Sequence, residues 1–177
     1  GKGVHILLQA VTDAPFTTCI VGGNPPDLLQ QYREEYMASG VMFVDHQPPA
    51  KIPLYLRAFD VVVAPFTQEP ISHFKIKGRL VPYDISSVMS PLKVFEYMAS
   101  GTPVVVSDLP VLREVLTTGV TAVMVTPGDP HALRQGIDGL LGDLDGAKDM
   151  AERARQVAQD YTWEARARDV LGGLIQE

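Results

Sequence analysis

Apolar residues along the chain follow two alternating patterns, a helical spacing and short continuous runs. The helical spacing predicts helices, and the short runs, rich in β-branched residues, predict strands that are buried on both faces. Helices are expected over residues 3–10, 27–39, 52–58, 90–100, 111–116, 130–141, 146–159 and 163–175. Strands are expected over residues 16–21, 41–44, 60–65, 102–107 and 122–125. This alternation predicts an α/β domain with a doubly wound, mostly parallel, Rossmann-like sheet and flanking helices.

Two segments depart from the regular alternation. The first predicted element is a helix, whereas a doubly wound domain normally opens with a strand, so we expect the first strand of the domain to be missing from the chain. Residues 66–89 carry prolines, a glycine and several charges between a strand and a helix. A connection of this length predicts an irregular functional loop.

Composition narrows the class of protein. The 177 residues, 46% of them hydrophobic, suit one domain, which we take to span residues 1–177. No apolar run reaches the roughly 18 residues that cross a bilayer, and the net charge of −6 argues against a nucleic-acid partner. The single cysteine, Cys19, lies in an apolar run, which indicates a buried, inert thiol in a reducing, cytoplasmic compartment.

The start of the helix predicted over residues 90–100 has the chemistry of an anion site. Ser90 is a good N-cap and Pro91 a good first helical residue, so the amides of Leu92 and Lys93 point beyond the helix end, where a phosphate fits. Lys93 adds a positive charge, and Glu96, one turn on, can accept hydrogen bonds from the two hydroxyls of a ribose. The alternative is a plain cap followed by a surface ion pair.

The same segment, SPLKVFEYMASGTPVVVSD, closely resembles the signature of retaining glycosyltransferases of family four, the glycosyl transferases group 1. Further matches occur in order along the chain: GKGVHILLQA, CIVGGNP, YLRAFDVVVAPF, VTPGDPHALRQGI and YTWEARARDVL. The resemblance implies the C-terminal, donor-binding domain of a GT-B-fold enzyme. It also implies that residues 160–177 form a helix contacting an absent N-terminal domain.

The resemblance assigns roles to matching positions. Lys2 corresponds to the lysine that contacts the donor diphosphate, and Glu96 to the glutamate that holds the ribose. The other glutamate of that motif is replaced by Val88. This replacement removes a usual contact to the donor sugar and leaves both the identity of the sugar and catalytic competence open. No residue is assigned a catalytic role.

Other candidates lie in loops. The resemblance places His46 where the nucleotide base is bound, and Gly22 and Gly23 at a turn near the nucleotide. A solvated histidine and a tight turn that needs positive φ are the structural alternatives. A basic cluster of Lys75, Lys77 and Arg79 either contacts the donor or acceptor or belongs to a solvated loop.

Together these features predict a transferase that moves a hexose-type sugar from a nucleotide diphosphate donor to a hydroxyl acceptor, with retention. We expect no cofactor and no metal, and we expect the isolated chain to bind the donor without turnover. The acceptor, and any peripheral membrane contact, would be bound by the missing domain. Two alternatives remain open: a nucleotide-sugar epimerase or phosphorylase of the same architecture, and a degenerate or regulatory α/β module that binds a nucleotide or a protein without catalysis.

Overall fold

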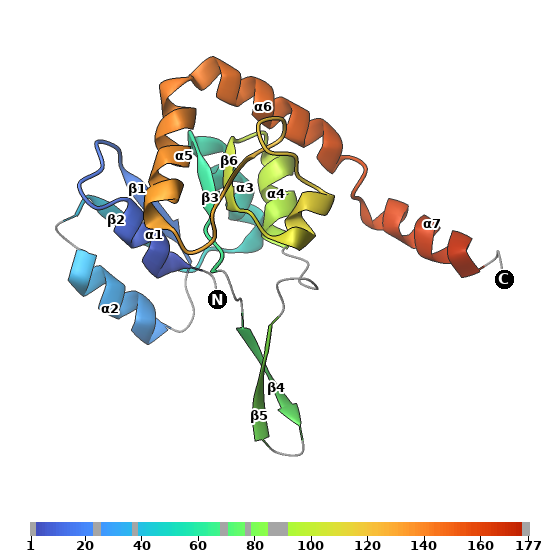
Figure 1. The fold of residues 1–177 in the computed structure, drawn as a ribbon, viewed down its shortest axis with the longest axis horizontal. Coiled ribbons are helices and arrows are strands. Elements are labelled where there is room, and N and C mark those ends of the chain that lie inside the picture. Colours follow the sequence, from blue (N-terminus) through green and yellow to red (C-terminus); the bar gives the residue numbers. More distant parts are fainter. Residues whose placement is uncertain are drawn as a thin grey trace.

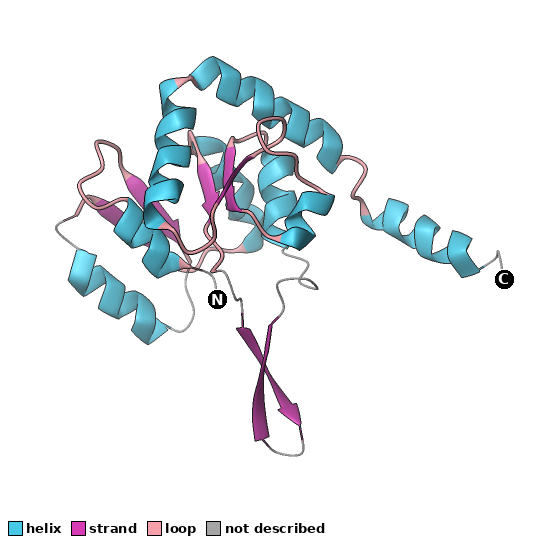
Figure 2. Ribbon diagram, viewed as in Figure 1, coloured by secondary structure: helices cyan, strands magenta, loops and turns pink. Residues whose placement is uncertain are grey.

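The computed structural model describes residues 3–22, 26–36, 39–67, 71–76, 79–84 and 92–174. Helices and strands alternate through most of the chain, as the sequence predicts (Figures 1 and 2). The helices are α1 (Val4–Ala10), α2 (Pro26–Tyr36), η1 (Pro49–Lys51), α3 (Ile52–Ala58), α4 (Leu92–Ser100), η2 (Pro110–Glu114), α5 (Pro130–Gly142), α6 (Leu144–Ala158) and α7 (Trp163–Leu174). The strands are β1 (Thr18–Val21), β2 (Val41–Val44), β3 (Val62–Ala64), β4 (Ile71–Ile76), β5 (Arg79–Asp84), β6 (Val104–Ser107) and β7 (Val123–Val125).

Where the five predicted strands pair with one another they pair in parallel, which confirms the predicted fold class. Among the described residues they form two hydrogen-bonded groups, β1–β2 and β3–β6–β7. Ile20 of β1 and Val63 of β3 nevertheless pack in one hydrophobic cluster with Leu8 of α1. Both groups therefore share a core, while the expected missing first strand stays a prediction.

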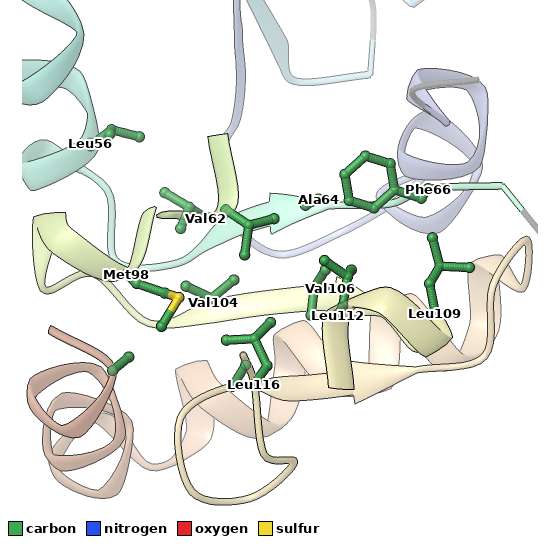
Figure 3. Packing of buried hydrophobic residues seen from close by; sticks show 13 residues of the cluster. Leu56, Val62, Ala64, Phe66, Met98, Val104, Val106, Leu109, Leu112 and Leu116 are labelled. Atoms are coloured by element: carbon green, nitrogen blue, oxygen red, sulfur yellow. The ribbon is translucent and has the colours of Figure 1, made fainter. Parts of the chain in front are cut away.

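Strand β6 lies at the centre of the core because both of its faces are covered. Val104, Val105 and Val106 are fully buried. Val104 and Val106 pack with Met98 of α4 on one side (Figure 3), and Val105 packs with Leu133 of α5 on the other. A run of consecutive valines is the pattern expected for a parallel strand between two layers of helices.

The prediction of an irregular loop over residues 66–89 is wrong for the central part of this segment. Strands β4 and β5 form an antiparallel hairpin, with Ile71 opposite Asp84 and Ile76 opposite Arg79, and this hairpin extends away from the body (Figure 1). β-branched and aromatic residues recur through both strands, and two residues, Lys-Gly, join them. A two-residue connection that ends in glycine is a hairpin signal that outweighs the scattered charges.

Smaller differences have local causes. The helix expected over residues 111–116 is the 3-10 helix η2, which begins at Pro110. Helix α6 begins before the expected Gly146 because the carboxylate of Asp143 accepts a hydrogen bond from the Gly146 amide (3.0 Å).

Cys19 is half-buried rather than buried as predicted, and its partial burial raises the pKa of its thiol. No described helix is long and apolar enough to cross a membrane.

Candidate functional site

The start of α1 lies directly against the end of β3. Gly3, the N-cap of α1, has φ 62°, and its carbonyl oxygen accepts hydrogen bonds from the amides of Ile6 (3.0 Å) and Leu7 (3.1 Å). A Cβ atom at Gly3 would overlap the carbonyl oxygen of Pro65. Both the left-handed backbone and the close approach require glycine here. Lys2, the predicted diphosphate contact, precedes this position and lies outside the described residues.

Phe66, next to Pro65, ties the end of β3 to the end of β6. Its amide donates to the carbonyl oxygen of Ala64 (3.0 Å), and its carbonyl oxygen accepts a hydrogen bond from the Ser107 hydroxyl (2.7 Å). Phe66 is 3% exposed and Ser107 2% exposed. Figure 3 shows Val62, Ala64 and the Phe66 ring in that order along β3 and just beyond its end, with the ring beside Ala64. The carboxyl ends of these two strands are thus held together by buried polar atoms.

Lys93 joins this group from the first turn of α4. Its Nζ atom lies 4.4 Å from the centroid of the Phe66 ring, a cation–π geometry. Since Gly3 contacts Pro65 and Lys93 contacts Phe66, the structure brings the starts of α1 and α4 to the same edge of the sheet. Ser90 and Pro91, the predicted cap, lie outside the described residues, and Leu92 is exposed.

Helix α4 presents the predicted ribose contact on its outer side. Val94 and Met98, four residues apart, are fully buried on one face of the helix. Glu96 lies midway between them in sequence and therefore on the opposite face, where it is exposed. Burial raises the pKa of the Tyr97 phenol, and the negative charge of Glu96 adds to the rise. Glu96 is therefore an accessible carboxylate one turn beyond Lys93, in the order that the sequence predicts.

A second group of predicted residues follows β1 and β2. The Gly22 amide donates to the carbonyl oxygen of Val44 (2.9 Å), so the ends of these two strands lie side by side. Gly22 has φ 83°, and a Cβ atom there would meet nothing within 4 Å. Its glycine therefore serves the backbone conformation rather than a close approach by described atoms. His46 is exposed, and Gly23 lies outside the described residues. Contacts of these residues with a nucleotide stay predictions.

Asp108 follows Ser107 at the end of β6. Its carboxylate accepts two hydrogen bonds from the Arg113 guanidinium (2.6 and 2.8 Å), and these bonds lower the pKa of Asp108. The amide of Asp108 donates to the carbonyl oxygen of Val125 (2.7 Å).

Among the residues that the structure describes, no three His, Cys, Asp or Glu side chains are grouped so that they could hold a metal ion.

Sequence reasoning missed Phe66, the residue that links the predicted positions. It follows the strand DVVVAP as one more apolar residue, and nothing in its spacing marks it. Its importance arises from contacts with residues that are distant in the chain, namely Ser107 and Lys93.

Residues 1–143 match the family described as glycosyl transferases group 1. The chain belongs to this family. The match confirms the resemblance seen in the sequence and covers the starts of both α1 and α4.

Curated relatives of this glycosyltransferase domain carry related names. A D-inositol 3-phosphate glycosyltransferase from Corynebacterium urealyticum is 29% identical over 96% of the chain and 39% of its own length. A glycogen synthase from Mycobacterium tuberculosis is 27% identical over 94% of the chain and 37% of its own length. The chain therefore spans about two fifths of the length of these relatives.

Solved structures of the GT-B fold resemble the glycosyltransferase domain over nearly its whole length. A sucrose-phosphate synthase from Thermosynechococcus elongatus has a TM-score of 0.76 and 25% identity, covering 99% of the chain and 42% of its own. HepE from Anabaena, solved in complex with UDP, has a TM-score of 0.79 and 22% identity, covering 99% and 46%. The C-terminal domain of a glycosyl transferase group 1 family protein from Francisella tularensis has a TM-score of 0.67 and 17% identity, covering 90% and 79%.

Proposed function

We propose that this domain binds the nucleotide diphosphate sugar of a retaining glycosyltransferase that transfers a hexose-type sugar to a hydroxyl acceptor. One observation carries the proposal: the starts of α1 and α4 meet at the carboxyl ends of β3 and β6, and Lys93 and Glu96 follow in order along α4. In open α/β sheets this edge is where ligands bind. Family membership supplies the reaction class.

The proposed chemistry follows from the charge that develops on the donor. When the bond between the sugar and the diphosphate breaks, negative charge grows on the departing diphosphate, and a fixed cation nearby stabilises it. Lys93 supplies such a cation within the described residues, and Lys2 is proposed to supply another. The amides at the start of α4 add the positive end of the helix dipole. Charge stabilisation by lysines and amides needs no metal ion, so we propose a metal-independent site.

UDP is the first nucleotide to test. HepE, which shares the fold, was solved in complex with UDP and with UDP-glucose. This likeness supports the choice of probe, while the base and sugar that the present domain binds stay proposals.

Calorimetric titration with UDP, GDP and ADP tests the proposed site. We expect micromolar binding of one nucleotide, and a loss of at least about tenfold in Glu96→Ala, because charge-assisted hydrogen bonds to the ribose contribute about 1.5–3 kcal/mol. Glu164→Ala is the matched control: Glu164 is also an exposed helical glutamate, in the first turn of α7. Equal affinities in both variants would contradict the role given to Glu96.

A second candidate function rests on Val88, which stands where the family carries a glutamate toward the donor sugar. A degenerate or regulatory domain that has lost this contact would bind a nucleotide or a protein partner without catalysing sugar transfer. No binding of any of the three nucleotides would favour a module that binds a protein partner instead. Nucleotide binding with no preference for the sugar-linked form would favour a degenerate donor domain.

A further inference from the structure

We propose that Arg33 is a positioning residue for the nucleotide base, because it fixes the segment after β2 against which the base would lie. This inference rests on the proposed function and deepens it by naming a residue that sets the choice of nucleotide. Its starting observation is that Nη2 of Arg33, on α2, donates to the carboxylate of Asp45 (2.5 Å) and to the carbonyl oxygen of Phe43 (3.4 Å). One side chain thus joins α2 both to β2 and to the first residue after β2.

The segment after β2 lies at the edge of the sheet that holds the proposed site. Helix α1 begins against Pro65, just beyond the carboxyl end of β3, and carries the chain back to the opposite edge, where β1 begins. Strand β1 therefore ends at the same edge as β3, and β2 pairs with it in parallel, with Val21 opposite Val44 at their ends. Asp45 and the residues after it thus lie along the edge that also holds the starts of α1 and α4.

A nucleoside diphosphate whose phosphates lie at the starts of α1 and α4 reaches along this edge with its base. Toward β7, the polar groups of Asp108 are already used, because its amide donates to Val125 and its carboxylate accepts from Arg113. Toward β2, the main-chain N–H and C=O groups of His46 make no hydrogen bond within the described part of the chain. Such groups can pair with the donors and acceptors of a base, so the geometry favours the β2 side for the base.

Hydrogen bonds hold the residues before His46 in one conformation. Three successive carbonyl oxygens each accept one: that of Phe43 from Arg33, that of Val44 from the Gly22 amide (2.9 Å) and that of Asp45 from the side-chain amide of Gln47 (3.1 Å). The bond from Arg33 to the Asp45 carboxylate adds a restraint from α2. A segment that is ordered before the ligand arrives costs less to order on binding.

Arg33 serves this segment more than it serves the stability of the fold. Its side chain is 32% exposed and that of Asp45 is 80% exposed, and an ion pair so open to water contributes little to folding. The Nε atom of Arg33 is buried, and no described atom accepts a hydrogen bond from it, which is itself unfavourable. Loss of this side chain should therefore displace residues 45–47 while leaving the stability of the domain nearly unchanged.

Calorimetric titration of the whole chain with UDP, GDP and ADP measures the effect on the choice of base. In Arg33→Gln we expect the preferred nucleotide to bind about threefold to tenfold more weakly, the effect of one misplaced hydrogen bond. The other two nucleotides carry the same ribose and diphosphate, so their affinities should change by less than about twofold. Arg33→Lys, which keeps the charge but not the planar guanidinium, should restore part of the preference.

Arg134→Gln is the matched control. Arg134, on α5, likewise donates to a carboxylate, that of Asp138 (2.8 Å), and to a carbonyl oxygen, that of Ala10 (3.4 Å). Its side chain is 25% exposed, and Ala10 is the last residue of α1, toward the edge of the sheet away from the proposed site. We expect this variant to keep both the affinity and the preference of the wild type.

Each outcome decides a different claim. A wild-type chain that binds none of the three nucleotides overturns the proposed function and this inference with it. A wild-type chain that binds all three with equal affinity leaves the proposed function standing and overturns the inference. So does an Arg33→Gln variant that weakens all three equally, which indicates a general structural role, or one that changes none of them.

Asp45→Ala covers the case in which Arg33→Gln does not fold. Asp45 is exposed, and its replacement removes the same ion pair without disturbing α2. We expect the same selective loss of the preferred nucleotide in this variant. An unchanged preference in the folded Asp45→Ala chain overturns the inference.

Discussion

Gly3 is the residue at which the candidate site depends most directly on backbone conformation. It combines φ 62° with the close approach of the Pro65 carbonyl oxygen. We predict that Gly3→Ala lowers the free energy of unfolding by about 2 kcal/mol or more, since positive φ and a steric overlap add. Urea unfolding measures the change. Gly22→Ala is the control, because Gly22 has φ 83° with open space around its Cβ position, and it should cost only about 1 kcal/mol. Equal losses would contradict the close approach.

A second prediction at this scale concerns Asp108, whose pKa is lowered by the hydrogen bonds from Arg113. The folded state therefore favours the carboxylate, so the stabilisation is complete above the unfolded-state pKa of about 3.9 and is lost as the pH falls toward the folded-state value. In Asp108→Asn, the decline of stability between about pH 5 and pH 2 should be shallower than in the wild type. Unfolding in urea across this range measures the difference, and Arg113→Gln should show the same shallower decline. Parallel pH profiles for all three proteins would contradict this origin of stability.

The packing of α5 on the sheet shows how one position sets the distance between two elements. A Cβ atom at Gly136 would lie 3.0 Å from Cγ1 of both Val105 and Val125, whereas one at Gly139 would meet nothing within 4 Å. Asp129 fixes the start of the same helix by accepting hydrogen bonds from the amides of His131 and Ala132. Helix α5 is therefore anchored at its first turn and packs closely at its centre.

This contrast gives a matched pair of substitutions in one helix. We expect Gly139→Ala to raise the free energy of unfolding by about 0.5–1 kcal/mol through helix propensity alone. Gly136→Ala should bring no gain, or a loss, because the added methyl group crowds the buried Val105 and the half-buried Val125. Thermal or urea unfolding compares them. Equal stabilisation by both substitutions would show that α5 does not pack as closely as the structure has it.

The hairpin of β4 and β5 extends from the body of the domain, and its two strands pair with each other. An isolated two-stranded hairpin is only marginally stable in water, so we expect it to gain contacts with a ligand or with another part of the protein. Its sequence contains Lys75, Lys77 and Arg79, and Arg79 is exposed. The earlier prediction that this basic cluster meets the donor or the acceptor stays a prediction.

At the scale of the whole molecule, helix α7 has exposed apolar side chains among its described residues. Trp163, at the start of α7, is 77% exposed, and Val170 and Leu171 are 52% and 58% exposed. These residues recur at helical spacing and form an apolar stripe on α7, which Figure 1 shows extending from the body. The predicted contact of residues 160–177 with a further domain would cover this stripe, and it stays a prediction.

Catalysis is predicted to need more than this chain, which spans about two fifths of the length of its curated relatives. The acceptor is proposed to bind to a part of the enzyme outside the 177 residues. We therefore expect the isolated chain to bind nucleotide but to release no sugar from a nucleotide sugar, in the presence or absence of hydroxyl acceptors. A radiolabelled donor assay measures this, with calorimetric binding of the same nucleotide as the positive control. Turnover by the isolated chain would contradict the prediction.

By itself, the sequence determined the order of helices and parallel strands, because apolar periodicity is a local property that each segment carries alone. It also indicated the family and the order of Lys93 and Glu96 on α4, since neighbours on a helix are set by spacing. Only the tertiary structure decided that Phe66 joins Ser107 and Lys93, and that Gly3 lies against Pro65. These contacts join residues far apart in the chain, and the packing of the strand ends, which no local pattern encodes, brings them together. The hairpin lies between these cases: its turn signal was local, but scattered charges and prolines obscured it.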